Sequence, residues 1–121
     1  MATTKEQAIH NFWSSFGLKA YDENSVPDDA VLPYITYSVG IDHINYPVSL
    51  VASLWYRDTA WVDITNKCEQ IAKRILNGGE MVNYDDGAVW ITGGTPFANR
   101  INTTNDTLKR ISINIEAEFI G

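Results

Sequence analysis

The stretch that decides the fold is Thr107–Gly121, TLKRISINIEAEFIG, in which apolar and polar residues alternate. Its apolar members are Ile111, Ile113, Ile115, Ala117 and Phe119; the polar residues between them are Arg110, Ser112, Asn114, Glu116 and Glu118. A period of two predicts a strand with one face on a core and the other toward water or a partner. At about ten residues, the strand is longer than the usual five or six. The chain therefore builds its sheet from at least one long, two-sided strand.

Two other segments have helical periodicity. Residues 4–16 carry one aromatic stripe and are predicted to form a helix. Thr4 with Gln7, or Thr3 with Glu6, can cap the start of this helix, and Gly17 can end it. Residues 60–77 have an apolar seam, which Asp58 or Thr59 can cap and which Gly78 can terminate. The stripe of the first helix comprises Ile9, Phe12, Trp13 and Phe16, and the seam of the second comprises Trp61, Ile64, Cys68, Ile71 and Ile75.

The remaining strands are predicted at 34–39, 48–57, 81–84 and 88–92, the last two flanking the turn signal Asp85-Asp86-Gly87. Residues 18–33 are expected to be an irregular connection. Gly93-Gly94-Thr95-Pro96 is expected to be a loop whose glycines adopt positive φ angles. The predicted fold class is α+β, a small antiparallel or mixed sheet of about four to five strands with two helices packed on one face. We expect residues 1–121 to form a single domain.

Composition narrows the class of protein. The chain is 45% hydrophobic and 12% aromatic, which excludes a disordered protein. Its formal net charge of −6 argues against a surface that grips duplex DNA. Cys68 is the single cysteine, so no internal disulfide is expected. No stretch is typical of a signal peptide or a membrane span, and we therefore expect a soluble protein made in a cytosol, with no membrane partner.

No catalytic, cofactor-binding or metal-binding constellation is recognisable. His10 and His43 are the only histidines, and neither belongs to a pattern that supplies three or four metal ligands. Cys68 lies in the helical seam, where a cysteine acts as a small apolar residue. Asp85-Asp86 fits turn chemistry better than paired carboxylates. We therefore expect a protein that is not an enzyme and that carries no cofactor.

Aromatic residues are in excess, with four tryptophans and six tyrosines. Trp13 and Trp61 fit the two helix seams and are expected in the core. Trp90 alternates with apolar neighbours, and its direction stays open. Tyr37, Tyr46 and Trp55 are candidate interface residues, because aromatic side chains are enriched where surfaces are buried on assembly, although ordinary core positions fit each of them as well.

The order of elements resembles a known group of proteins. A Pro-Tyr-Ile-Thr-Tyr strand (33–37) follows a helix and a loop. Next come a second strand and a helix that ends in Ile-Leu-Asn-Gly (75–78). They are followed by a strand that bears Trp90 and by Pro96-Phe97, which precedes the last strand. This layout is similar to that of the tail terminator (tail completion) proteins of long-tailed bacteriophages and the related head-tail joining proteins. The similarity covers nearly the whole chain as an order of elements, with no invariant motif.

The resemblance implies a virion protein of the tail or neck, assembled in the bacterial host cytoplasm. Such subunits form a homo-hexameric ring that caps the tail tube and ends its polymerisation. The tail tube protein lies on one face and the head-tail connector protein on the other, and DNA passes through the lumen without specific binding. We expect contacts with neighbouring rings from the loop 40–46 and the segment 93–101. The candidates there are Asp42, His43, Ile44 and Tyr46, with Phe97 as an apolar anchor and Arg100 as a charged donor.

Other functions fit the same sequence. A head-closure or connector subunit, or a tail tube subunit, would share the assembly role. A small soluble ligand-binding module belongs to a different class and predicts a concave pocket in a protein that stays monomeric.

Overall fold

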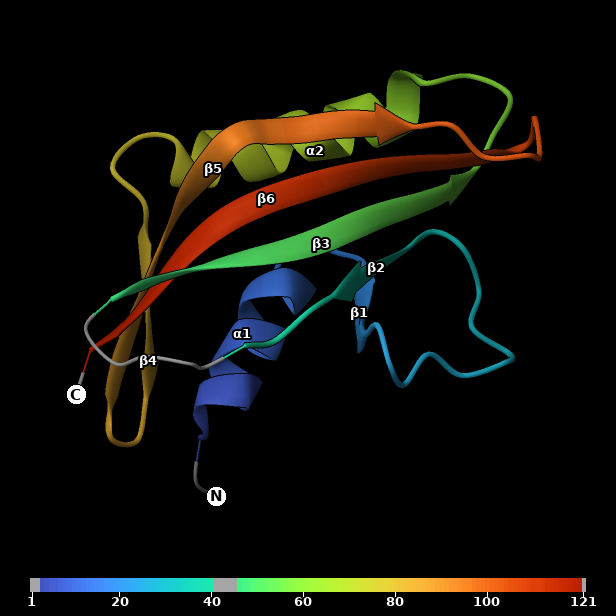
Figure 1. The fold of residues 1–121 in the computed structure, drawn as a ribbon. Helices are drawn as coiled ribbons and strands as arrows, with labels where there is room; N and C mark the ends of the chain where they lie inside the picture. Colours follow the sequence, from blue (N-terminus) through green and yellow to red (C-terminus); the bar gives the residue numbers. More distant parts are fainter. Residues whose placement is uncertain (1–2, 41–45, 121) are drawn as a thin grey trace.

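The computed structural model describes residues 3–40 and 46–120 (Figure 1). Within these residues, two helices and six strands follow one another. They are α1 (Lys5–Ser14), β1 (Lys19–Asp22), β2 (Tyr34–Tyr37), β3 (Pro47–Arg57), α2 (Val62–Ile75), β4 (Glu80–Tyr84), β5 (Gly87–Ile101) and β6 (Leu108–Ile120).

The strands form one mixed sheet in the order β1-β2-β3-β6-β5-β4. β1 and β2 run parallel, and every other neighbouring pair is antiparallel. The predicted α+β class is therefore confirmed, but the expected four to five strands were too few. The missed strand is β1, a four-residue edge strand inside the segment expected to be irregular. Four residues are too short to show a clear alternation of apolar and polar side chains.

The alternating C-terminal stretch forms β6, which lies between β3 and β5 in the sheet. Its odd-numbered residues from Ile111 to Phe119 are at most 4% exposed, and the even-numbered residues between them are partly exposed. Eleven consecutive residues of β3, Pro47–Arg57, pair with Glu118–Leu108 of β6. The predicted long, two-sided strand is thus confirmed, and it forms the middle of the sheet.

Both helices bury their apolar stripes in the same core cluster as the inner face of β6. In Figure 1, α2 runs behind β5 and β6, which leaves the opposite face of these strands without a covering helix. Ile9, Phe12, Trp13 and Phe16 of the predicted first stripe are each at most 1% exposed. The rings of Phe12 and Trp13 meet edge to face, with centroids 4.9 Å apart.

The caps of the two helices differ. The Thr4 hydroxyl accepts a hydrogen bond from the Gln7 amide (3.1 Å), as the sequence predicted. For α2, the predicted cap by Asp58 or Thr59 is wrong: Trp61 occupies the N-cap position and makes no side-chain cap hydrogen bond. Asp58 instead accepts from the Ala60 amide (3.0 Å), which orders the turn before the helix.

The predicted glycine loop is wrong in both parts. Gly93 and Gly94 belong to β5, at an irregularity of register between Gly93 and Ala98, and the glycines with positive φ are Gly17, Gly78 and Gly79. The reason for glycine here is close packing. A Cβ atom on Gly94 would lie 2.9 Å from Asn114 Cβ and 3.0 Å from its backbone oxygen, and a Cβ on Gly93 would lie 2.4 Å from Leu76 Cδ2. β5 can therefore pass close to both β6 and α2.

Candidate functional site

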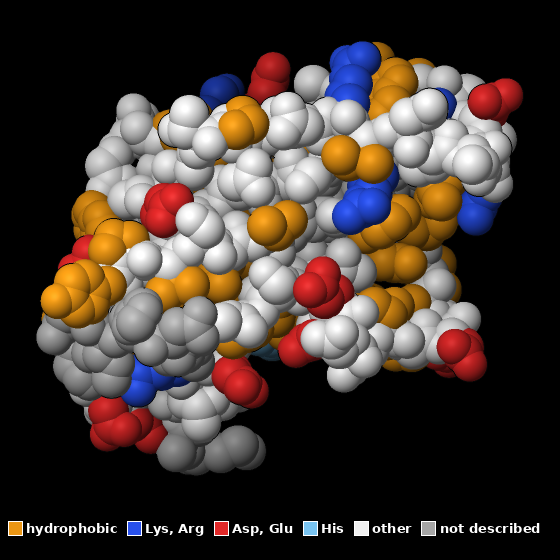
Figure 2. Space-filling view, in the orientation of Figure 1, with side chains coloured by type: hydrophobic (Ala, Val, Ile, Leu, Met, Phe, Trp, Pro, Cys, Tyr) orange, Lys and Arg blue, Asp and Glu red, His pale blue; other side chains and the backbone are white. Residues whose placement is uncertain are grey.

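The helices leave one face of the sheet uncovered (Figure 1). This face is formed mainly by the odd-numbered residues of β3, the even-numbered residues of β6 and the side chains paired with them across the ladder. Figure 2, in the orientation of Figure 1, shows separate hydrophobic side chains on the middle of this face and larger hydrophobic areas toward its two ends. A sheet with one polar face suits contact with water or with another protein.

Large apolar side chains lie exposed toward one end of this face. Met81 is 47% exposed, Trp90 37% and Ile120 40%. The backbone register pairs Met81 with Trp90 and Trp90 with Glu118, so these residues are neighbours across three strands. Pro47, Trp90, Thr92, Glu116 and Glu118 line a shallow hollow beside them. Exposed aromatic side chains such as that of Trp90 are enriched in protein contacts, whereas carboxylates are depleted there.

Toward the other end, side-chain contacts organise the same face. The guanidinium of Arg110 lies over the Trp55 ring, 4.7 Å from its centroid, and Arg110 Nε donates to Ser53 Oγ (3.1 Å). Trp55 Nε1 donates to Thr36 Oγ1 (2.9 Å). The indole and the guanidinium therefore hold one another in place as a preformed surface.

The structure separates the predicted interface residues into different settings. Trp55 and Tyr46 are accessible: Trp55 is partly exposed on the uncovered face, and Tyr46 is 66% exposed. Tyr37 is only 6% exposed and its hydroxyl lies 2.9 Å from His10 Nδ1, so little of its ring is open to a partner. Asp42, His43 and Ile44 lie outside the described residues.

Phe97 and Arg100 lie on β5 but do not share one environment. Phe97 is half-buried and packs against the core cluster. Arg100 is exposed, and its guanidinium stacks on the Trp61 ring with 4.6 Å to the centroid. Phe97 therefore supports the fold locally, whereas Arg100 presents its charge to the surroundings.

Sequence reasoning did not single out Met81, Trp90 and Ile120 as surface residues. The signal that could have placed Trp90 is its register in the hairpin, because a turn at Asp85-Asp86 fixes which face each residue of β5 occupies. Ile120 continues the alternation of β6 to the outer face, so its direction could have been read from the sequence. Met81 is followed by the apolar Val82, so its direction could not be read from its neighbours.

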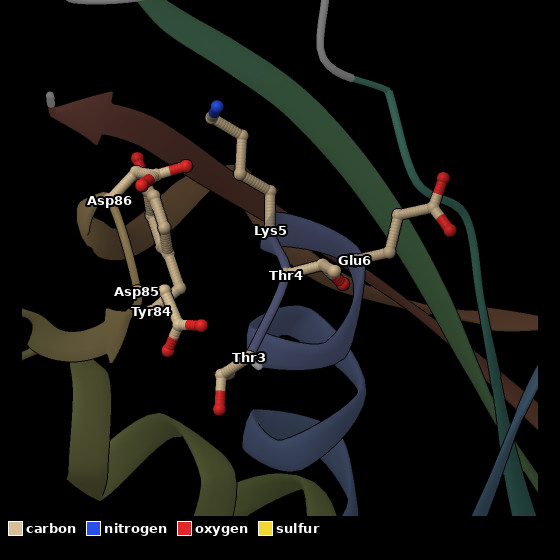
Figure 3. A pocket seen from close by; sticks show the side chains of 7 residues that line it. All are labelled: Thr3, Thr4, Lys5, Glu6, Tyr84, Asp85 and Asp86. Atoms are coloured by element: carbon tan, nitrogen blue, oxygen red, sulfur yellow. The ribbon is translucent and has the colours of Figure 1, made fainter. Parts of the chain in front are cut away.

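A separate recess lies between the start of α1 and the β4–β5 turn (Figure 3). The Asp85 amide donates to the Thr3 backbone oxygen (2.9 Å), and Lys5 Nζ lies 5.3 Å from the centroid of the Tyr84 ring. Burial, and secondarily the charge of Asp86, raises the pKa of the Tyr84 hydroxyl above its usual value. In Figure 3 the carboxylates of Glu6, Asp85 and Asp86 are spread around the recess rather than converging on one point.

Chemically reactive groups are not assembled in the described part of the chain. Within residues 3–40 and 46–120, no group of three or more His, Cys, Asp or Glu side chains is placed to hold a metal ion. Cys68 is buried in α2, where burial and then the neighbouring Glu69 raise the pKa of its thiol. None of the described helices is long and apolar enough to cross a membrane.

Comparison with known proteins gives a match in fold. No family model and no curated protein matches the sequence. Among solved structures, the chain is similar to one from the "Virion of native gene transfer agent (GTA) particle", with a TM-score of 0.60 and 13% sequence identity. The match covers 88% of this chain and 81% of that chain. The two chains thus share an arrangement of helices and strands over most of their lengths.

Proposed function

We propose that this chain is a structural subunit of a phage-like particle, and specifically a tail terminator that forms a hexameric ring. The ring closes the tail tube, ends its polymerisation and offers its other face to the head-tail connector. The observation that carries this proposal is the fold shared over 88% of the chain with a component of a gene transfer agent virion.

The uncovered sheet face supports an assembly role. Its exposed residues Met81, Trp90 and Ile120 are large and apolar; Met81 and Trp90 are paired in the register, and Ile120 is paired with Ala88 on the same β5 strand. Trp90 is 37% exposed in the single chain, and a partner surface that covers the rest of its indole removes further apolar area from water. The exposed Tyr46 and the partly exposed Trp55 are further contact residues in this proposal.

Net charge supports a ring that DNA passes through. Six copies of a chain with a formal charge of −6 carry about −36, and such a wall repels the phosphate backbone. The proposed lumen therefore guides DNA without holding it. Assembly in the host cytoplasm and a position in the tail or neck of the virion complete the proposal.

The test is native mass measured against protein concentration, with negative-stain images of the same samples. The expected species has six subunits and appears as a ring with a central hole. A chain that remains monomeric at all concentrations contradicts a self-assembled ring and favours the ligand-binding module. Open-ended stacks of rings contradict a terminator and favour a tail tube subunit. A closed ring of another number favours a connector or head-closure subunit.

A variant pair makes the test specific to the uncovered face. Trp90→Ser removes the exposed indole, and we expect it to shift ring formation to higher concentration. The matched control is Val62→Ser, because Val62 is also exposed (62%) but lies on α2, on the helix side of the sheet. Equal assembly by both variants would show that the apolar patch takes no part in the contact.

A further inference from the structure

Four of the nine Lys and Arg residues gather at one end of the sheet, where β3 and β5 end and β6 begins. The register places Arg57 opposite Leu108 and Arg110 opposite both Trp55 and Ile101. We call this region the basic end, and it comprises Arg57, Arg100, Lys109 and Arg110. In Figure 2 most of the visible Lys and Arg side chains lie toward the right-hand end of the molecule.

The cations of the basic end have no carboxylate partner among the described residues. Arg57 donates to the Thr107 hydroxyl (3.2 Å), and Lys109 donates to the Asp106 backbone oxygen (2.7 Å). Arg100 and Arg110 stack on tryptophan rings. The ion pair found in the described part of the chain, between Arg74 and Glu80, lies elsewhere.

Carboxylates are also present at this end, in Asp58, Asp63 and Asp106. None of them is within ion-pair distance of a described Lys or Arg side chain. The positive groups are therefore not neutralised by direct contact in a chain that carries an excess of six negative charges.

The opposite end of the sheet is acidic. Asp85 and Asp86 form the exposed turn between β4 and β5, and Glu118 and Glu116 lie on the uncovered face opposite Trp90 and Thr92, four and six residues along β5 from Asp86. We call these four residues the acidic end. Glu116 accepts a hydrogen bond from the Ser49 hydroxyl (2.9 Å), and none of the four forms an ion pair with a described Lys or Arg. Lys5 and Glu6 lie near the same turn (Figure 3).

The two ends are too far apart to satisfy one another within one chain. Arg110 and Glu118 lie on the same face of β6, eight residues apart, which corresponds to roughly 26 Å along a strand. At an ionic strength of 0.1 M the screening length is about 10 Å, so these charges hardly interact. Each end therefore offers uncompensated charge to an outside partner.

We propose that the basic end of one copy contacts the acidic end of the next copy, so that identical chains join head to tail. This inference rests on the proposed ring, because a closed ring requires one surface to meet a different surface on the neighbouring subunit. It gives Arg100 a role between subunits of one ring, in place of the contact between rings expected from the sequence.

The position of the cations favours an end contact over a face-to-face dimer. Arg57 and Arg110 lie on the uncovered face, whereas Arg100 and Lys109 lie on the helix side, over the ring of Trp61. A dimer formed through the uncovered faces would leave Arg100 and Lys109 without partners. A neighbour that covers the end of the sheet can reach all four.

Complementary charge reversal tests the contact. One variant, Arg57→Glu with Arg100→Glu, leaves two cations and two new carboxylates at the basic end beside Asp58, Asp63 and Asp106, so that both ends are acidic. The other, Asp85→Lys with Asp86→Lys and Glu118→Lys, leaves Glu116 as the one carboxylate of the acidic end beside three lysines, so that both ends are basic. Each alone is expected to need at least about ten times more protein to assemble, because attraction across the contact becomes repulsion. An equimolar mixture of the two is expected to assemble again, since acidic ends meet basic ends. Native mass at 50 and 500 mM NaCl measures the assembly of each variant and of the mixture. The complexes formed in the mixture should be weaker at 500 mM NaCl.

The controls distinguish an effect on the contact from loss of folding and from a general effect of changed net charge. Lys73→Glu and Glu69→Lys each reverse one charge at an exposed position of α2, outside both ends, and measure what a charge reversal there does to assembly. Circular dichroism melts check that every variant is folded, and the milder Arg57→Gln with Arg100→Gln replaces the first variant if it is not.

The outcomes distinguish the head-to-tail contact from the ring itself. If wild-type rings form and the reversed variants assemble equally well, the contact is wrong and the ring stands. If the wild-type chain is monomeric but the mixture forms complexes, the contact stands and the self-assembled ring is wrong. If neither assembles, both are wrong. If the mixture forms only dimers, the head-to-tail arrangement is wrong.

Discussion

The two faces of β6 differ in what they contact, although their residues alternate along one strand. The inner residues, from Ile111 to Phe119, are almost fully enclosed by two helices and the neighbouring strands. The outer residues and their cross-strand neighbours remain accessible, including the large apolar side chains of Trp90 and Met81. The inner face is thus complete within one chain, and the outer face carries the exposed residues on which the proposed assembly depends.

The largest expected difference between the faces is in stability. Ile113 is 0% exposed, and Ile113→Ala should lower the free energy of unfolding by about 2–5 kcal/mol through lost burial and a cavity. The adjacent Asn114→Ala removes one hydrogen bond to the Pro96 backbone oxygen and should cost about 1 kcal/mol. Urea denaturation of both variants measures the contrast, and similar losses would contradict the assignment of the faces.

A second, smaller contrast concerns the adjacent glycines of β5. Gly94→Ala places a Cβ against the backbone of Asn114 and should cost about 1–3 kcal/mol, because backbone atoms of a central strand cannot move aside easily. Gly93→Ala meets the far end of the Leu76 side chain, which is 55% exposed and can turn away. Thermal melts should therefore show the lower midpoint for Gly94→Ala, and the reverse order would show that β5 and β6 are less closely apposed.

On the outer face, stability and assembly should separate. Trp90→Ser is expected to lower the free energy of unfolding by about 1–2 kcal/mol, less than Ile113→Ala, because more than a third of the indole is already in water. Its effect should appear in the native mass instead. A stability loss as large as that of Ile113→Ala would place Trp90 in the fold rather than in a contact.

The smallest expected effect is on stability at alkaline pH, where the buried Tyr84 makes the free energy of unfolding depend on pH. Its pKa is raised above about 10 by burial, so the unfolded chain releases this proton at a lower pH than the folded chain. The stabilisation that the Tyr84 hydroxyl provides is complete below its pKa in the unfolded chain. It is lost as the pH rises through its pKa in the folded chain. Urea denaturation from pH 9 to 11.5 should show a shallower decline for Tyr84→Phe than for wild type; parallel curves would contradict the raised pKa.

Much of the fold could be predicted because it depends on patterns local to each element. The alternation in β6, the stripe of α1 and the turn at Asp85-Asp86 each indicated the observed element. The glycines of β5 could not be predicted correctly, because their role depends on Leu76 and Asn114, which are distant in sequence. The candidate site was harder to predict from the sequence than the fold. Trp55 could be selected as an aromatic residue on a polar face, but the exposure of Met81 depends on its being in an edge strand, which the sequence alone does not show.

The central place of β6 has a consequence for how the chain folds. β3 pairs along its whole length with a strand about sixty residues later, and β5 also needs β6 as its neighbour. Such a topology has a high contact order, which slows folding relative to proteins built from local contacts. During synthesis, β3 and β5 must wait with unpaired edges until β6 leaves the ribosome, and in that interval the nascent chain is most exposed to aggregation.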